Sequence, residues 1–505
     1  MSWQDKLKEH FPDKVIEKHL MSNLARRTIP RFVSEYLLAK YAQRGQDEAI
    51  RVANQIMRDY YPEMRHSQRV LFELSTEGTK RILGFFTARF DTKLNIPLVS
   101  TRLFGKEDMR ILPKILDTYP ILLEGGAWGI ADLIYDSGVT VEGRKLPILI
   151  TNFAPFQVER IDVEDYKEQR RHFSTDEWVS VLISTIGLNP NAYDMDEKLL
   201  ILTRFIPLVE PNTTLLELGP RGTGKTFGLR NISPYSFIIS GGKTTSAQLF
   251  LNLRTMEVGL LAKKDVVVFD EIAATKFEKR DDVLGKLKDF MASGSFSRGG
   301  EEIPSECAIV MLGNTDHAVP DDENMDEEME ETLADDTLPS EWSEPVDEAS
   351  GKVGTRYLFQ ALPDPLWDTA FFDRLHGFIP GWRIPKIRTV SFSKDVGFVA
   401  DYFAEILHRL RRDDYTHLVR SKVNVYTKDE VEVTSRDEEA VVRVICGLIK
   451  LLYPHGDFTD NELASLAQIA CSLRTRVAQQ QHHIEILTSG SAREFPLKTL
   501  QCELR

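Results

Sequence analysis

The pattern of hydrophobic and polar positions changes near residue 65. In residues 1–65 the apolar positions have the spacing of amphipathic helices, as in VSEYLLAKYA and EAIRVANQIMRDYY. Residues 66–160 instead contain short apolar runs separated by Gly, Pro and Asn, namely VLFEL, ILGFFTARF, IPLVSTRLF and LPILITNF. Such runs are typical of strands. We therefore predict an N-terminal helical segment followed by a β-rich module.

Residues 161–211 have the pattern of a helical connector. Ser174 and Glu177 have the spacing of a capping box ahead of the apolar stretch EWVSVLIST, and a Gly and an Asn-Pro pair follow it. A second helix is predicted over residues 194–205. The connector therefore contains two helices.

From residue 212 strand-like and helix-like patterns alternate. The apolar runs TTLLEL, FIIS, VVVFD and AIVMLGN are separated by helical patterns such as SAQLFLNLRTMEVGLLA. This alternation predicts an α/β core over residues 212–392, a parallel sheet covered by helices. Residues 393–505 are mainly helical and are predicted to form a helical lid on that core. The capping boxes expected there are Ser435 with Glu438 and Thr459 with Glu462.

The composition is that of a soluble globular protein. The chain has 505 residues, 42% hydrophobic and 28% charged, enough for roughly three domains. No apolar run approaches the ~18 residues of a membrane span, so no membrane partner is expected. The cysteines lie far apart without a CxxC pair, which predicts neither a zinc module nor a disulfide frame and favours a reducing compartment, the cytoplasm. They are Cys307, Cys446, Cys471 and Cys502.

The net charge of −14 comes from one short segment. Residues 321–348 contain 14 Asp and Glu and no Lys or Arg, so the rest of the chain is neutral overall. This pattern predicts a solvated acidic loop over residues 320–350. A DNA mimic or a gating element is the alternative interpretation. Total charge therefore excludes no class of partner.

A phosphate-binding motif follows the strand TTLLEL and opens a helix. Backbone N–H groups of such a Gly-rich turn close around phosphate oxygens, and the helix N-terminus adds positive potential. The lysine of the motif can reach the β and γ phosphates of ATP, and the threonine hydroxyl can bind Mg²⁺. An ordinary Gly-rich turn is the alternative. The motif consists of Gly219, Pro220, Arg221, Gly222, Thr223, Gly224, Lys225 and Thr226.

Polar residues at the ends of two later strands predict hydrolysis. Asp270 ends the run VVVF and is expected to hold the hydration shell of Mg²⁺, while Glu271 can polarise a water for attack on the γ phosphate. Asn314 ends AIVMLGN and can orient that water without adding charge. A strand end for the Asp-Glu pair and a turn for the Asn are the simpler alternatives.

Three arginines are candidates for transition-state or phosphate contacts. Arg374, in FFDRLHGF, is expected to project from the subunit edge and to act across an interface, where such an arginine contributes about 10³–10⁵ in rate. A salt bridge to Asp373 or a charge at a helix end is the alternative. Arg474 and Arg476, in the helix LASLAQIACSLRTRV, could reach the phosphates from the lid, and the sequence does not decide between them.

This ordered set of motifs is similar to the AAA+ ATPases over residues 195–490. In detail the chain resembles the BrxL family, the Lon-related AAA+ proteins of BREX phage-defence systems. The segments that carry this resemblance are IPRFVSEYLLAKY, RRHFSTDEWVSVLISTIGLNP, ELGPRGTGKT, SGSFSRGG and DRLHGFIPGWRIPK.

The resemblance implies a homo-oligomeric ring, a hexamer or heptamer that can stack, with ATP sites between subunits. It also implies binding of double-stranded DNA and action with other BREX components against phage. Family members often carry a Lon-like protease domain after the lid. Since the chain ends at Arg505, we expect no peptidase activity from these residues.

DNA contacts are expected from basic side chains that meet phosphates. The candidates are the cluster Arg26, Arg27 and Arg31 in the N-terminal segment, Arg298 at the apex of a predicted hairpin SFSRGG, and Lys243 after FIISGG. Each of them is also consistent with an ordinary solvated surface charge. No pattern resembles a major-groove code, so we expect contacts that do not depend on base sequence.

The favoured hypothesis is an ATP-driven motor that encircles and moves along duplex DNA. A protein unfoldase is the alternative, but it normally needs an aromatic residue in the first pore loop, and residues 241–245 contain none. A third hypothesis is an ATP-dependent switch that binds DNA without travelling along it.

Overall fold

The computed structural model of the protein divides into two compact units. The first consists of residues 1–10, 162–395 and 404–505, and the second of residues 11–161 and 396–403. Arg26, Arg27 and the predicted acidic loop 320–350 lie outside the described residues. Described are residues 1–24, 29–105, 107–156, 161–254, 256–278, 280–298, 300–315, 355–427, 431–490 and 493–505.

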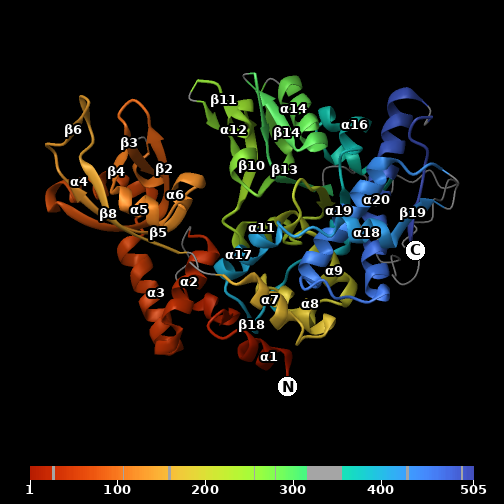
Figure 1. Ribbon diagram of the computed structural model, residues 1–505, viewed down its shortest axis with the longest axis horizontal. Helices are drawn as coiled ribbons and strands as arrows, with labels where there is room; N and C mark the ends of the chain where they lie inside the picture. Colours follow the sequence, from red (N-terminus) through yellow and green to blue (C-terminus); the bar gives the residue numbers. More distant parts are fainter. Residues whose placement is uncertain are drawn as a thin grey trace, which may run out of the picture. The chain divides into compact units, whose positions relative to one another are not determined.

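A five-stranded parallel sheet is the centre of the first unit (Figure 1). Its inner strands are apolar runs in which nearly every side chain is buried, as a parallel sheet covered on both faces requires. The predicted α/β class with a parallel sheet is confirmed. In spatial order the strands are β10 (Ser236–Thr244), β13 (Val266–Phe277), β16 (Ala308–Asn314), β9 (Thr214–Gly219) and β17 (Gly377–Pro380).

The register of this sheet brings the predicted motif residues to one edge. Asn314 at the end of β16 is paired with Gly219 at the end of β9, and Asp270 on β13 is paired with Ser240 on β10. Beyond Asp270, β13 contains extra residues before Thr275 pairs with Gly242. In an open α/β sheet, ligands bind outside the carboxyl ends of the strands.

Helices before and after the strands complete the first unit. The capping boxes predicted at Ser174 and at Thr459 are confirmed. The one predicted at Ser435 with Glu438 is wrong by one residue, because Thr434 caps the helix and Asp437 is its partner. The longer helices are α1 (Trp3–His10), α7 (Val163–Arg170), α8 (Thr175–Thr185), α9 (Met195–Thr203), α11 (Lys225–Ile232), α14 (Arg280–Ser293), α19 (Ser435–Leu452) and α20 (Asp460–Ser489). Helix α17 (Ala400–Leu410) belongs to this unit from residue 404 onward.

Short helices and hairpins lie between these elements. The sequence SFSRGG forms the predicted hairpin, since β14 pairs antiparallel with β15 and Arg298 pairs with Glu301. The short helices are α10 (Ile206–Val209), α12 (Ser246–Leu249), α13 (Leu260–Lys263), α16 (Thr369–Phe372) and α18 (Thr416–Lys422). The hairpins are β11 (Leu251–Asn252) with β12 (Glu257–Val258), β14 (Ser295–Arg298) with β15 (Glu301–Pro304), and β19 (Val423–Thr427) with β20 (Leu500–Leu504).

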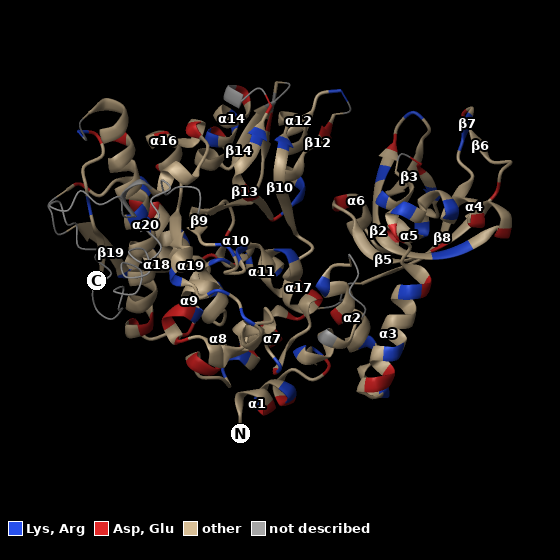
Figure 2. Ribbon diagram, turned by 180° about the vertical axis from the view of Figure 1, so that it is seen from behind, with Lys and Arg blue, Asp and Glu red and all other residues tan. Residues whose placement is uncertain are grey.

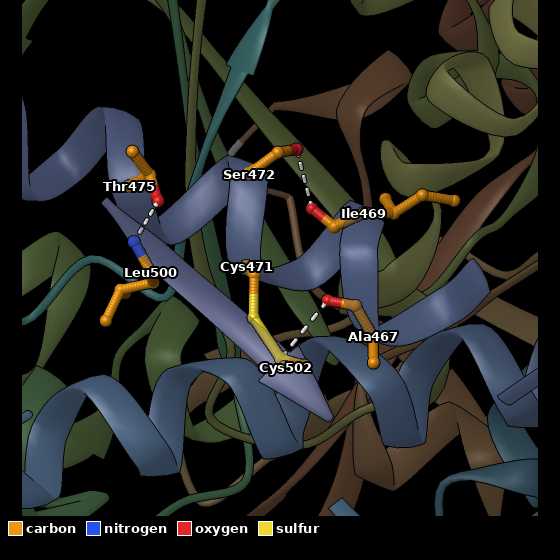
Figure 3. The surroundings of a disulfide bond; sticks show 7 residues. All are labelled: Ala467, Ile469, Cys471, Ser472, Thr475, Leu500 and Cys502. Carbon is orange, nitrogen blue, oxygen red and sulfur yellow. Dashed lines mark hydrogen bonds between the residues drawn. A yellow bond between two sulfur atoms is a disulfide. The ribbon is translucent and has the colours of Figure 1, made fainter. Parts of the chain in front are cut away.

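A disulfide joins α20 to the C-terminal strand β20. Cys471 and Cys502 are 31 residues apart in sequence, and the bond between them lies beside a hydrogen bond from the Leu500 amide to Thr475 Oγ1 of 2.9 Å (Figure 3). The expectation that the cysteines form no disulfide is therefore wrong. Spacing alone could not reveal the pair, because β20 folds back along a helix that is 30 residues long. The expected cytoplasmic location stays a prediction.

A closed barrel forms most of the second unit. Four of its five strand pairs are antiparallel, and β4 pairs with β8 in parallel. Around the barrel the order is β2 (Thr79–Asp91), β3 (Ile96–Thr101), β4 (Met109–Ile111), β8 (Ile148–Pro155) and β5 (Ala127–Tyr135). VLFEL, expected as a strand, instead lies in α4 (Ser67–Glu77), which buries Val70 and Leu74 on one face.

The remaining α-helices and strands described in this unit are four helices and two antiparallel strand pairs. They are α2 (Arg31–Tyr41), α3 (Gln46–Tyr60), α5 (Pro113–Thr118), α6 (Ile121–Glu124), the hairpin of β6 (Thr140–Val141) and β7 (Arg144–Lys145), and the pair β1 (Val15–Glu17) and β18 (Val396–Phe398). Across the described part of both units, no helix combines the length and the apolar character needed to cross a membrane.

Candidate nucleotide site

The turn between β9 and α11 has the backbone conformation that the phosphate-binding motif requires. Gly222 and Gly224 have φ values of +92° and +75°, in the left-handed region that favours glycine. A Cβ on Gly224 would also lie only 2.4 Å from Cδ1 of Ile387. Both glycines are therefore needed for the shape of the loop.

Residues 381–388 pack on this loop, which the sequence did not predict. A Cβ on Gly219 would lie 2.5 Å from the carbonyl carbon of Gly381, and the Ile387 amide donates a 2.8 Å hydrogen bond to the carbonyl oxygen of Gly222. The exposed Lys386 side chain passes close to Gly222. The segment that follows β17 thus fixes one wall of the loop.

A buried ion pair supports the loop from beneath. Arg204 donates to both carboxylate oxygens of Glu217, at 2.9 and 2.6 Å, and to the carbonyl oxygen of Thr223 at 3.2 Å. The side chains of Arg204 and Glu217 are 4% and 0% exposed. Sequence reasoning missed this pair, although a glutamate inside the apolar run TTLLEL was the available signal, because a buried charge needs a partner.

Lys225, Thr226 and Asp270 meet at the mouth of the loop. Lys225 Nζ donates to the carbonyl oxygens of Gly219 and Pro220, both at 2.7 Å, and Thr226 Oγ1 donates to Asp270 Oδ1 at 2.9 Å. A hydroxyl and a carboxylate side by side are hard oxygen donors of the kind Mg²⁺ prefers. The residues present therefore fit a nucleotide phosphate with its Mg²⁺, which Thr226 and Asp270 would hold.

Glu271 directly follows Asp270 on β13, and Asn314 ends the neighbouring strand β16. Glu271 is exposed and has a φ of +54°, uncommon for a residue other than glycine. Strain of this kind is concentrated at functional sites. Asn314 ends β16 in register with Gly219. The structure thus brings both residues to the edge that carries the phosphate-binding loop.

Arg374 lies at the other end of the strands, just before the amino end of β17. His376 exchanges hydrogen bonds with Thr214, the first residue of β9, with the His376 amide donating at 2.8 Å and the Thr214 amide donating to His376 Nδ1 at 2.9 Å. At about 3.3 Å per residue, Thr214 and Gly219 are about 17 Å apart. That separation is too large for Arg374 to reach the loop of its own subunit.

The local contacts of Arg374 agree with one alternative interpretation from the sequence. Its Nη1 donates to the carbonyl oxygen of Ala370 in α16, as expected of a charge at a helix end. Asp373 instead pairs with Arg436 and Arg474. Among the described residues, the buried Nε of Arg374 has no hydrogen-bond partner.

The expectation that Arg474 reaches a phosphate is wrong for this structure. The side chain is fully buried and binds the carboxylates of Asp437 and Asp373. Arg476 is 7% exposed and donates to the Ser472 carbonyl oxygen one turn earlier in α20. Both arginines therefore lie on the buried side of α20 and bond within the protein.

The candidate DNA contacts differ in what surrounds them. Arg31 donates to Glu35 Oε1 at 2.8 Å, and Glu35 is buried against Lys18, so Arg31 is committed to a structural ion pair and is corrected as a DNA candidate. Lys243 is exposed and lies directly opposite the exposed Lys276, where β10 and β13 extend beyond Ser240 and Asp270. The Arg298 side chain lies outside the described atoms.

The parallel sheet and this loop define a P-loop nucleotide-binding protein. Residues 148–340 and 345–490 match the family described as "Lon-like protease BrxL-like, ATPase domain", and residues 9–135 match "BREX system Lon protease-like protein BrxL N-terminal". The chain belongs to the BrxL family.

Two curated relatives are each 32% identical over 94% of this chain, the Lon-like protease BrxL of Bacillus cereus (strain H3081.97) and that of Escherichia coli O9:H4 (strain HS). The chain spans 66% and 64% of their lengths. The crystal structure of a full-length MCM homolog from Methanopyrus kandleri aligns with 80% of this chain and 79% of that one. Its TM-score of 0.42 and identity of 11% are too low to establish a shared fold.

Proposed function

We propose that the protein is a ring-forming AAA+ ATPase whose ATP sites are shared between neighbouring subunits. The observation that supports this most strongly is the separation of the catalytic candidates. The loop, the carboxylates and Asn314 lie at one edge of the sheet, and Arg374 lies at the other. Neighbours arranged head to tail in a closed ring would bring the two edges together.

Each residue then has a role that follows from its place. Backbone N–H groups of the loop and Lys225 bind the phosphates, and Thr226 with Asp270 holds Mg²⁺, which supplies charge neutralisation when bound. Glu271 polarises the attacking water and Asn314 orients it. Arg374 of the neighbouring subunit stabilises the charge that develops on the γ phosphate.

We further propose that the ring acts on double-stranded DNA, as a translocase in BREX phage defence together with other BREX components. Support comes from the barrel, whose strand order of 1-2-3-5-4 along the chain is that of the OB-fold, a fold that often binds oligonucleotides. Phe90 on its surface is 56% exposed, and Lys93 follows in the loop between β2 and β3. Lys243 and Lys276 are exposed basic positions of the first unit, and Figure 2 colours all Lys and Arg along the ribbon blue.

A polypeptide substrate is the second candidate, favoured by the turn between β11 and β12. Leu253 and Met256 there are 51% and 56% exposed, and exposed apolar side chains at a hairpin tip suit an unfolded chain better than a phosphate backbone.

ATP turnover of the purified protein, with and without duplex DNA at low salt, tests the proposal. We expect duplex DNA to raise turnover, and we expect the ATPase to displace a protein roadblock from the DNA end. Lys225→Ala and Arg374→Ala should each abolish turnover, and mixing the two variants should restore part of it. If duplex DNA does not change ATP turnover, the translocase proposal is contradicted. If DNA raises turnover but the roadblock stays on the DNA, a DNA-bound switch is favoured.

A further inference from the structure

A single buried arginine holds the backbone on both sides of Arg374. Arg474 Nη1 donates to the carbonyl oxygen of Asp373 at 3.2 Å and to that of Leu375 at 2.6 Å. Its Nη2 donates to the Asp373 carboxylate at 3.2 Å. Three hydrogen bonds from one guanidinium therefore fix the residues that immediately precede and follow Arg374.

The same guanidinium is anchored to the helices that follow the core. Arg474 Nε donates to Asp437 Oδ1 at 2.9 Å, and Asp437 is also the capping-box residue at the start of α19. Lys498, just before β20, donates to the other oxygen of Asp437 at 2.5 Å. Arg474 and Lys498 thus both contact the buried Asp437 carboxylate, while the Asp373 carboxylate is shared between Arg474 and the exposed Arg436. Although burial alone raises the pKa of Asp437, Arg474 and Lys498 keep it below its ordinary value.

The Arg374 side chain is less fully bonded than the backbone that carries it. It donates to Ala370 in α16 and lines a cavity of about 300 Å³ together with Asp373, Arg436, Arg443 and His376. Within the described structure its buried Nε has no hydrogen-bond partner. A group held by its backbone, with donor capacity left over, is suited to an acceptor that arrives with another subunit.

We propose that Arg474 is a positioning residue that sets Arg374 for the ATP site of the neighbouring subunit. This inference rests on the proposed shared site, and it moves Arg474 from the subunit's own nucleotide to the neighbour's. Through Asp437 and Lys498, the position of α19 and of the C-terminal strand controls the placement of Arg374. A 1 Å misplacement of a catalytic group can cost about 100-fold in rate.

Arg474→Lys is the informative substitution. Lysine keeps the charge but cannot bind two carbonyls and two carboxylates in one plane. We expect kcat to fall about 100-fold while the KM for ATP and the affinity for a fluorescent ATP analogue stay unchanged. Asp373→Asn, which removes a carboxylate partner of Arg474, should reproduce this pattern. The matched control is Arg411→Lys, since Arg411 is also buried and binds two carbonyl oxygens, those of Pro207 and Glu306, in the same unit.

Mixed rings separate this role from its alternatives. Arg474→Lys subunits keep an intact loop, so mixing them with Lys225→Ala subunits should restore turnover as well as Arg374→Ala subunits do. Mixing them with Arg374→Ala subunits should restore nothing, because both lesions lie on the same side of the interface. The reverse result would overturn the proposal by placing Arg474 at its own nucleotide.

Two further outcomes are decisive. If Arg474→Lys is rescued by neither partner while Arg374→Ala is rescued by Lys225→Ala, Arg474 serves folding alone and the proposal is wrong. If Arg374→Ala with Lys225→Ala also gives no turnover, the shared site itself is refuted, and the role of Arg474 falls with it.

Discussion

Replacing Arg204 by methionine tests whether the buried ion pair beneath the phosphate-binding loop holds that loop in place. The substitution keeps the length of the side chain but leaves the Glu217 carboxylate, 0% exposed, without its cation. Removing one partner of a buried pair costs about 3–5 kcal/mol, because the remaining charge stays out of water. The Thr223 carbonyl also loses its donor.

The double variant Arg204→Met, Glu217→Leu separates stability from binding. With both charges gone, a buried pair replaced by apolar residues is often neutral, so we expect the free energy of unfolding to return to within about 1–2 kcal/mol of the parent. Arg204→Met should lower the affinity for ATP, because the Thr223 carbonyl in the loop loses its donor. The double variant should keep this low affinity, because it does not restore that donor. The control is a surface ion pair between Arg420 and Glu439. Because the Arg420 side chain is 45% exposed, Arg420→Met should cost less than about 1 kcal/mol.

Urea unfolding followed by circular dichroism measures the stability of the four proteins, and titration with a fluorescent ATP analogue measures binding. A loss below about 1 kcal/mol for Arg204→Met would refute the account of a buried, unsolvated pair. If the double variant regains both stability and ATP affinity, Arg204 does not position the loop. If it stays as unstable as the single variant, packing rather than charge explains the loss.

Three further predictions follow from other sites. Glu271→Gln should keep ATP binding but lower turnover by about 100-fold or more, which single-turnover kinetics would detect, and full turnover would remove Glu271 from the mechanism. Asp401, beside Lys18 and Glu35, is buried and its pKa is raised to about 7. The folded state therefore keeps the proton of Asp401 to higher pH than the unfolded state, and the free energy of unfolding should fall as pH rises from about 4 to 7. In Asp401→Asn, the melting temperature should lose this dependence on pH. An unchanged dependence would exclude Asp401 as its source. Changing Lys243 and Lys276 to Glu should weaken DNA binding and reduce its salt dependence, with ATP affinity as the unaffected control, and an unchanged salt slope would remove both as phosphate contacts.

The parts of the site that the sequence predicted are those fixed by local spacing. The motif from Gly219 to Thr226 specifies its own loop, because glycines with positive φ and the start of a helix are properties of neighbouring residues. Asp270 and Asn314 end apolar runs of a parallel sheet, and such ends share one edge. Their assembly could therefore be predicted without coordinates.

Contacts between segments that are remote along the chain could not be predicted in the same way. The wall formed by Gly381 and Ile387 depends on how the segment after β17 crosses the loop. The Cys471–Cys502 bond depends on β20 returning along α20. Neither leaves a periodic signal in the sequence, since both result from contacts between segments that are remote along the chain.

The buried charged residues explain why the sequence predicted the wrong partner for Arg474. Glu217 and Arg474 both interrupt apolar runs, and such an interruption indicates a buried charge that must find a partner. The sequence does not say whether that partner is a ligand phosphate or a carboxylate of the same chain. For Arg474 the partners are Asp373 and Asp437. Because Asp373 adjoins Arg374, we propose that this buried arginine serves the nucleotide site of a neighbouring subunit rather than its own. An arginine inside an apolar helix after the core is therefore first expected to be a structural cation. Any role in catalysis then depends on which residues that cation holds in place.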